Sequence, residues 1–256
     1  MNRINQLFKK KDRNILSVYF TAGFPKIDDT VAVLKELQSN GIDLVEIGIP
    51  FSDPMADGVV IQQSSHVALK NGMSIRKLFE QLTDIRKEIH LPLVMMGYLN
   101  PIMQFGFENF CRECDRVGVD GMIIPDLPMS DYLSEYKLVA DKCNLKFIFL
   151  ITPETSEERI REIDEHTDGF IYMVSSAAVT GTQSNFDSRI AYFNRIKAMH
   201  LKNPRLIGFG VSNKATLDTV NQYASGAIIG SAFIKALQEN KEVKSGVKMM
   251  LSNIYH

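Results

Sequence analysis

A regular alternation of short apolar segments and amphipathic segments is the feature that most limits how this chain can fold. Apolar segments rich in β-branched and aromatic residues recur about every thirty residues, and the stretches between them carry apolar residues at helical spacing. Strands that are apolar on both faces and joined by helices form a parallel sheet. The eight predicted strands are 15–20, 44–49, 93–96, 121–125, 146–151, 169–174, 205–209 and 226–230.

Eight such βα units within 256 residues match the (β/α)₈ barrel, an α/β fold of eight parallel strands inside a ring of helices. A doubly wound open sheet is the alternative, but it normally has fewer strands and a GxGxxG turn after the first, where this chain has Thr21-Ala-Gly-Phe-Pro25. No linker rich in Pro, Gly or Ser divides the sequence. We therefore expect one TIM barrel domain over residues 1–256, with an extra amphipathic helix at the N-terminus and another over 241–256.

Composition argues against several classes of protein. The 29 Lys and Arg residues balance 30 Asp and Glu residues, so no strong positive field attracts a nucleic acid. No apolar run reaches the length of about eighteen residues that spans a bilayer, and the N-terminal sequence becomes polar too early for a signal peptide. Three cysteines are too few for a disulfide framework, which suits a reducing compartment. We expect a cytoplasmic protein that binds neither nucleic acid nor membrane.

The cysteines and histidines lack the spacing of a metal site. Cys111 and Cys114 have a CxxC spacing, but they share one apolar helical stripe with Phe107, Phe110 and Val117. Free cysteine is among the most buried residue types, so this stripe predicts core packing rather than zinc or redox chemistry. The five histidines are scattered without ligand spacing. The sequence therefore predicts no metal site.

Glu46, near the end of the second predicted strand, is the strongest candidate for chemistry. In a barrel, the active site lies at the C-terminal ends of the strands. Side-chain alternation over 44–49 places the apolar residues against the helices and Glu46 inside the barrel, next to Gly48, which leaves space above it. Poor solvation raises the pKa of a carboxyl, so Glu46 is a candidate general acid or base. A buried glutamate paired with a neighbouring Lys or Arg is the alternative.

Loops at other strand ends carry further candidates. Asp53 and Asp57 follow the second strand, and each is either a solvated turn residue or a carboxylate that leans over the barrel mouth. Gly210, Gly230 and Ser231 follow the last two strands and fit a phosphate site built from backbone N–H groups, with simple tight turns as the alternative. Because no Lys or Arg lies within 226–231, backbone dipoles would hold most of that phosphate.

The segment Glu46-Ile-Gly-Ile-Pro-Phe-Ser-Asp-Pro-Met-Ala-Asp57-Gly resembles the signature of the tryptophan synthase α subunit family. The resemblance implies a (β/α)₈ lyase that cleaves indole-3-glycerol phosphate to indole and glyceraldehyde 3-phosphate in tryptophan biosynthesis, with no cofactor of its own. It also implies an α₂β₂ complex in which a partner β subunit carries pyridoxal phosphate and receives the indole. Further segments resemble the same family in the same order and extend the similarity over nearly the whole chain: 19–25, 97–102, 118–128, 170–181, 208–212 and 230–233.

The resemblance also implies roles for individual residues. Glu46 would be the catalytic acid/base, and Asp57, kept ionised by a wetter loop, would bind and polarise the indole N–H. Asp53, Asn100 and Pro101 would lie at the partner interface. The implied substrate-binding residues are Phe20, Tyr172, Thr180, Gly181, Phe209, Gly210, Gly230 and Ser231.

The chain departs from the family pattern at three positions. Val59 stands where the family usually has Pro, and Ser176 and Ala178 stand where the mobile loop after the sixth strand usually has Arg and Gly. Because these changes affect loop closure, a weakly active partner that binds and activates a β subunit is the alternative function. Another phosphate-binding barrel, such as a sugar-phosphate isomerase, is a third, which the spacing from Glu46 to Asp57 disfavours.

Overall fold

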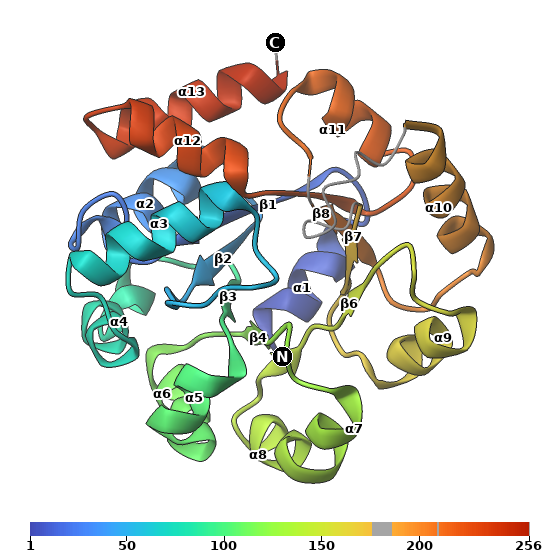
Figure 1. Ribbon diagram of the computed structural model, residues 1–256, viewed down its shortest axis with the longest axis horizontal. Helices are drawn as coiled ribbons and strands as arrows, with labels where there is room; N and C mark the ends of the chain where they lie inside the picture. Colours follow the sequence, from blue (N-terminus) through green and yellow to red (C-terminus); the bar gives the residue numbers. More distant parts are fainter. Residues whose placement is uncertain (176–185, 209, 256) are drawn as a thin grey trace.

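The fold places a ring of helices around central strands, as the ribbon in Figure 1 shows. The computed structural model describes residues 1–175, 186–208 and 210–255. Each segment predicted as a strand contains at least one, and the predicted helices lie between them. The strands are β1 (Ile15–Thr21), β2 (Leu44–Gly48), β3 (Leu93–Met96), β4 (Gly121–Ile123), β5 (Lys146–Phe147), β6 (Leu150–Ile151), β7 (Ile171–Val174), β8 (Arg205–Gly208) and β9 (Gly226–Ile229).

The parallel sheet closes on itself. Its strands lie in the order β5-β4-β3-β2-β1-β9-β8-β7-β6, so β5 and β6 stand at the two ends. Both belong to the single predicted segment 146–151. Between them, the N–H of Ile148 donates to the carbonyl of Met122 at 3.0 Å, and the carbonyl of Phe149 accepts from the N–H of Tyr172 at 2.9 Å. The segment thus bonds to β4 on one side and β7 on the other, which completes the barrel, and the open-sheet alternative is wrong.

Helices alternate with the strands and cover the outside of the barrel. Helix α4, the second helix after β2, begins at a capped N-terminus, where the hydroxyl of Ser74 accepts from the N–H of Lys77. Short 3₁₀ and π-helical turns occur at η1 (Ile85–Lys87) and η2 (Tyr132–Tyr136). The α-helices are α1 (Arg3–Lys10), α2 (Asp29–Ser39), α3 (Val59–Lys70), α4 (Ile75–Leu82), α5 (Leu99–Phe105), α6 (Phe107–Val117), α7 (Met129–Asp131), α8 (Lys137–Lys142), α9 (Glu157–His166), α10 (Phe186–Ala198), α11 (Lys214–Val220), α12 (Ser231–Glu239) and α13 (Val243–Tyr255).

The core has two layers because successive side chains of a strand point to opposite faces. One cluster fills the barrel interior and includes Ile15, Leu44 and Val94. A larger cluster packs the outer strand faces against the helices, and it contains Val45 and Ile47, as predicted. Each fully buried aliphatic side chain stabilises the fold by roughly 1.5–3 kcal/mol.

Helix α1, which the amphipathic pattern predicted, closes the N-terminal end of the barrel. Ile4 is fully buried and packs into the interior cluster. Asn2 caps the helix, and its side-chain amide donates to the carbonyls of Asp120 and Asn144 at 2.7 and 2.8 Å. With this end occupied, a ligand can approach the interior from the C-terminal ends of the strands.

Helix α13 packs on the outside of the barrel, beside α12 (Figure 1). Its buried side chains include Val247, Met250 and Ile254, which matches the predicted apolar stripe. The two helices approach closely at Gly246: a Cβ atom added to this residue would lie 3.1 Å from the carbonyl oxygen of Ala236. Glycine at this position therefore sets how near the two helices can lie.

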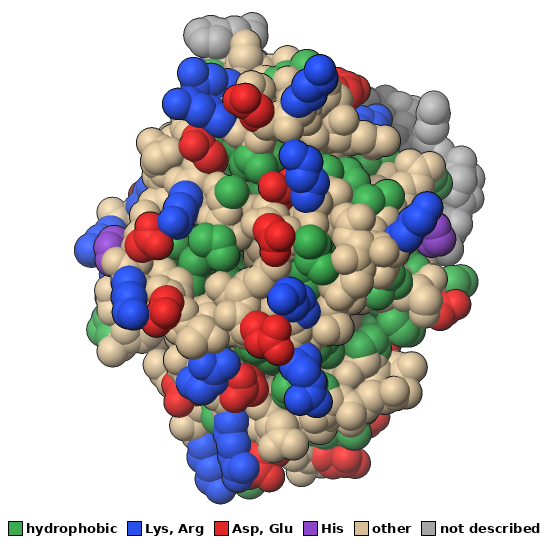
Figure 2. Space-filling view, turned by 90° about the vertical axis from the view of Figure 1, so that its left-hand side faces the viewer, with side chains coloured by type: hydrophobic (Ala, Val, Ile, Leu, Met, Phe, Trp, Pro, Cys, Tyr) green, Lys and Arg blue, Asp and Glu red, His purple; other side chains and the backbone are tan. Residues whose placement is uncertain are grey.

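The surface and the cysteines are those of an ordinary folded protein. Positive and negative side chains are interspersed on the face shown in Figure 2. Cys111 and Cys114 are fully buried in the outer core layer, which confirms their predicted packing role. Within the described ranges, no helix is long and apolar enough to cross a membrane. The same residues contain no group of His, Cys, Asp and Glu side chains that could hold a metal ion.

Candidate functional site

Glu46 lies inside the barrel on β2, where the predicted alternation places it. Its side chain is fully buried, and the one hydrogen bond that the described residues make to it comes from the hydroxyl of Ser17, which donates to Oε1 at 2.8 Å. Oε2 has no hydrogen-bond partner among the residues described. Burial raises the pKa of Glu46 to about 7, and the bond from Ser17 opposes this shift. No Lys or Arg in the described part of the chain pairs with Glu46, so the ion-pair alternative is wrong.

Two tyrosines lie beside the buried glutamate. Gly48 does not leave an empty space above it, as the sequence suggested, because the hydroxyl of Tyr19 takes that place: a Cβ on Gly48 would lie 2.1 Å from it. Gly208 accommodates Tyr172 in the same way, with a Cβ position 2.2 Å from the hydroxyl. Burial raises the pKa of both phenols, and the nearby charges of the two candidate carboxylates raise it further. Both tyrosines therefore stay neutral near the site.

Asp57 is held at the barrel mouth by Tyr98. The hydroxyl of Tyr98 donates to Oδ2 of Asp57 at 3.0 Å and accepts from the N–H of Ala56 at 2.9 Å. Burial raises the pKa of Asp57 to about 6, against the opposing effect of the Tyr98 hydrogen bond. Asp57 is half-buried in a loop whose neighbouring residues are exposed, so it is better solvated than the fully buried Glu46, as predicted. A pKa of about 6 leaves it mostly ionised at pH 7.

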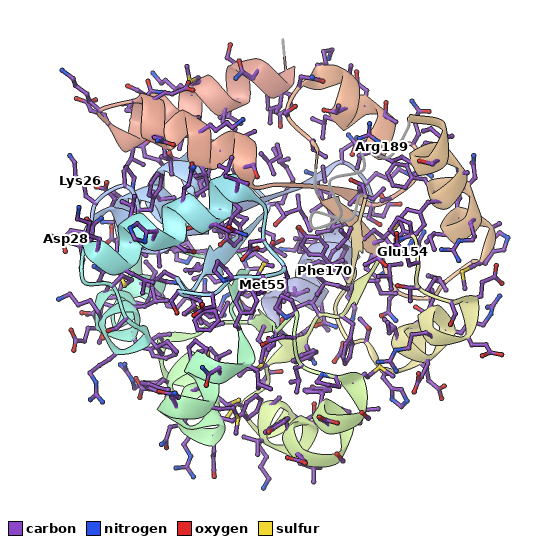
Figure 3. The ribbon with its side chains drawn as sticks, in the orientation of Figure 1. Lys26, Asp28, Met55, Glu154, Phe170 and Arg189 are labelled. Atoms are coloured by element: carbon purple, nitrogen blue, oxygen red, sulfur yellow. The ribbon has the colours of Figure 1, made fainter. Side chains whose placement is uncertain are left out.

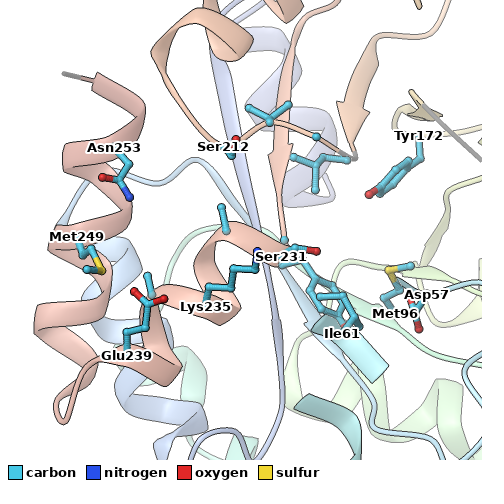
Figure 4. Close-up of a pocket in the computed structure, with 17 residues that line it drawn as sticks. Asp57, Ile61, Met96, Tyr172, Ser212, Ser231, Lys235, Glu239, Met249 and Asn253 are labelled. Carbon is cyan, nitrogen blue, oxygen red and sulfur yellow. The ribbon is translucent and has the colours of Figure 1, made fainter. Parts of the chain in front are cut away.

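A cavity of about 360 Å³ opens over these groups, a size that suits a small organic ligand (Figure 4). Glu46 does not line it, but Tyr19, the register partner of Glu46 on β1, does. Apolar side chains and a few polar groups form the wall. The lining includes Tyr19, Asp57, Ile61, Met96, Tyr172, Gly210, Val211, Ser212, Ile228, Gly230 and Ser231, with further residues of α12 and α13.

One end of the cavity presents backbone N–H groups. Gly230 is the N-cap of α12 and has no side chain with which to cap the N–H groups of the first turn, and Ser231 and Ala232 of this turn line the cavity. Gly210 has φ +89°, a conformation that favours glycine. All three predicted phosphate-site residues therefore line one cavity, next to a helix N-terminus that favours anions.

The aromatic side chain that lines the cavity from β1 is Tyr19, not the predicted Phe20. Phe20 is fully buried in the outer core layer, because it points to the opposite face of the strand. Sequence analysis also missed Tyr98, although it lies in the family-like segment 97–102. Its signal is an aromatic side chain with a polar group, placed directly after the third strand. The predicted positions Thr180, Gly181, Phe209, Ser176 and Ala178 lie outside the described residues.

The residues predicted to contact a partner lie at the same end of the barrel, Asp53 on the loop after β2 and Asn100 and Pro101 in the first turn of α5. Asp53 and Asn100 are exposed, and Pro101 is half-buried. Two large apolar side chains are exposed beside them, Met55 at 73% and Met103 at 43%. Figure 3 shows Met55 in the loop after β2, near the centre of the view. None of these five residues lines the cavity, but Asp53 and Met55 belong to the same loop as Asp57, which does.

Comparisons with known proteins agree with one another along the chain. The family model for the tryptophan synthase alpha chain matches residues 5–254. Tryptophan synthase alpha chains from Phocaeicola vulgatus (62% identity, 93% of each chain) and Parabacteroides distasonis (60% identity, 98% of each) are similar over nearly their full length. The crystal structure of tryptophan synthase subunit alpha from Legionella pneumophila is similar with a TM-score of 0.85 and 32% identity, over 99% of this chain and 100% of that chain.

Proposed function

The chain belongs to the tryptophan synthase alpha chain family, and we propose that Glu46 and Asp57 carry its reaction. The reaction is the cleavage of indole-3-glycerol phosphate to indole and glyceraldehyde 3-phosphate in tryptophan biosynthesis. The alpha chain has no cofactor, and pyridoxal phosphate resides in the beta subunit. The observation that carries our assignment is the fully buried Glu46, whose pKa of about 7 lets it both give and accept a proton near neutral pH.

The first step is protonation of the indole ring. Protonated Glu46 gives its proton to carbon 3 of the indole, and positive charge develops on the indole nitrogen. Asp57, with a pKa of about 6, is ionised and stabilises the cationic N–H. Its carboxylate is already held by Tyr98, so little reorganisation is needed as the charge forms.

The second step is cleavage of the carbon–carbon bond. The carboxylate of Glu46 now accepts the proton of the hydroxyl on the glycerol carbon that is attached to the ring. That carbon becomes the aldehyde of glyceraldehyde 3-phosphate, and the electrons of the broken bond return to the ring, neutralising the nitrogen. Glu46 ends protonated, as it began, so a single carboxyl serves both proton transfers.

The remaining walls of the cavity suit the two ends of the substrate. Tyr19, Tyr172 and Ile61 present ring and aliphatic surface for the flat, apolar indole. Gly230 and Ser231 present backbone N–H groups for the phosphate, as helix N-termini do. We infer that the substrate lies with its indole near Asp57 and its phosphate at the start of α12.

We also infer that a beta subunit docks on the exposed surface formed by the loop after β2 and by α5, in an α₂β₂ complex. The carboxyl of Asp53 and the polar side chain of Asn100 stand beside the exposed Met55 and Met103, a combination typical of interfaces. A partner there lies next to the entrance and can receive indole.

We further infer a cytoplasmic location, because the three cysteines are unpaired, as is usual in a reducing compartment.

Indole release from indole-3-glycerol phosphate tests the function directly. We expect the purified chain to release indole in the absence of a partner. We expect faster release when a beta subunit is added, because the partner covers the loop that holds Asp57. Size-exclusion chromatography with light scattering reports whether the complex has the α₂β₂ mass. The absence of indole release under both conditions would refute the proposed activity of this chain.

Replacing Tyr98 by Phe tests how Asp57 is positioned. The variant keeps the ring, which packs against Phe51 with centroids 5.2 Å apart, but removes the hydroxyl that joins Asp57 to the N–H of Ala56. We expect kcat to fall about tenfold, the effect of one hydrogen bond to a charged group. Since that bond lowers the pKa of Asp57, the acidic limb of the pH–rate profile should move to higher pH. An unchanged rate and limb would assign Tyr98 a purely structural role.

A further inference from the structure

The cavity extends beyond the proposed phosphate end, along α12. Lys235 lies one helical turn after Ser231, and both residues line the cavity. Figure 4 shows the side chain of Lys235 reaching back along the helix toward Ser231, as helical side chains do. The ammonium group therefore lies beside the N-terminal turn of α12, where the cavity is lined by backbone N–H groups.

This ammonium has no anionic partner in the described part of the chain. Glu239 is the carboxylate one turn further along the same helix face and also lines the cavity, yet no ion pair joins it to Lys235. Figure 4 shows Glu239 on the far side of Lys235 from Ser231. Lys235 is exposed, so solvent screens much of its repulsion from the positive end of the helix dipole, and an anion bound between the ammonium and the helix N-terminus would be attracted to both.

We propose that Lys235 binds the phosphate group of the substrate and makes this site selective for phosphorylated ligands. This proposal rests on the proposed function, because it assumes that the phosphate lies at Gly230 and Ser231. Backbone N–H groups alone carry partial charges, whereas the ammonium supplies a full charge that can approach the phosphate oxygens. Residues 226–231 contain no Lys or Arg, but a helical turn brings Lys235 next to them.

Arg189 is a second cation near this end of the cavity, and the experiment must separate the two. Its Nη1 atom lies 3.5 Å from the Cβ position of Gly210, and its Nε atom is buried without a hydrogen-bond partner in the described ranges. It lines a separate space of about 60 Å³ together with Ser175 and Gly210. Figure 3 places Arg189 near the start of α10. Because Lys235 lines the main cavity and Arg189 does not, we assign the phosphate contact to Lys235.

The test compares ligands with and without phosphate in Lys235→Met, Lys235→Arg and a control, Lys248→Met, which removes an exposed lysine of α13 outside the cavity lining. In Lys235→Met we expect the KM for indole-3-glycerol phosphate and the inhibition constant of inorganic phosphate to rise about tenfold, the effect of one charged hydrogen bond. The value of kcat and the affinity for free indole should change less than about twofold, since neither depends on the phosphate contact. Lys235→Arg should restore most of the phosphate affinity, and the control should match the parent.

The outcomes distinguish this inference from the function on which it rests. If the parent chain cleaves the substrate but Lys235→Met binds phosphate as tightly as the parent, the role of Lys235 is refuted and the lyase function stands. The same holds if Arg189→Met weakens phosphate binding and Lys235→Met does not. If Lys235→Met lowers the affinity for free indole as much as the affinity for phosphate, the residue shapes the cavity and does not recognise the anion. If the parent cleaves no substrate, the proposed function fails, and the phosphate titrations still decide whether Lys235 binds an anion.

Discussion

A chain with Glu46 replaced by Gln is expected to cleave indole-3-glycerol phosphate about 10⁴-fold more slowly than the parent. Loss of a general acid or base typically costs ~10²–10⁴ in rate, and a carboxyl that serves both proton transfers belongs at the upper end. Glutamine keeps the shape of the side chain and can still accept the hydrogen bond from Ser17, but it cannot relay a proton. Steady-state indole release measures the effect. A well-folded variant that keeps more than about a tenth of the parent activity would refute the assignment.

The same variant makes an independent prediction about stability. The pKa of Glu46 is about 7 in the folded chain, above its ordinary value of 4.5, so between these pH values the folded state binds more protons than the unfolded state. The free energy of unfolding of the parent therefore falls as pH rises from 4.5 to about 7, because folding holds the ionised carboxyl in a poorly solvated place. Glutamine does not ionise, so Glu46→Gln loses no free energy of unfolding in this way as pH rises.

Urea unfolding at two pH values measures this difference. At pH 5 we expect the two proteins to have similar free energies of unfolding, and at pH 8 we expect Glu46→Gln to be more stable by on the order of 3 kcal/mol. Such a gain, together with the lost activity, would show that the fold is intact and that the carboxyl is kept for chemistry. A variant that is less stable at pH 8 would show instead that the Glu46 carboxylate stabilises the folded chain.

The strands could be predicted because most of them are apolar on both faces, a pattern that only a covered parallel sheet explains. The division of segment 146–151 into β5 and β6 could not be predicted. It arises where Ile148 bonds to one neighbouring strand and Phe149 leads to the other, and these bonds depend on how the closed barrel sets the register. Closure is a property of all the strands together, so no single segment carries its signal.

The site was predictable where a polar residue marks one face of a strand. Glu46 stands among apolar residues on β2, so alternation assigns it to the interior. Every residue of β1 is buried, and the polar residues on its inward face, Ser17 and Thr21, are small and tolerate either face. Alternation alone therefore did not correct the assignment of Phe20, which the family resemblance implied, to Tyr19. Tyr98 and Lys235 act across a loop and along a helix, and their placement depends on contacts between elements that are distant in the sequence.

Replacing Asp57 by Asn should lower kcat by about 10²–10³ and change KM only a few-fold, because the charge that Asp57 stabilises appears in the transition state and not in the bound substrate. Asparagine keeps an oxygen that can accept the hydrogen bond from Tyr98, so the loop should keep its position. Steady-state kinetics separate the two parameters. A large rise in KM at constant kcat would mean that Asp57 only holds the substrate.

The pH–rate profile of this variant identifies which carboxyl gives which limb. In the parent, the reaction needs Asp57 ionised and Glu46 protonated, so kcat/KM should fall below the Asp57 pKa of about 6 and above the Glu46 pKa of about 7. Asparagine does not titrate, so Asp57→Asn should lose the acidic limb and keep the basic one. Tyr98→Phe, which retains the carboxyl, should keep both limbs and move the acidic one upward. If Asp57→Asn kept an acidic limb near pH 6, another group would have to provide the negative charge, and the electrostatic role of Asp57 would be wrong.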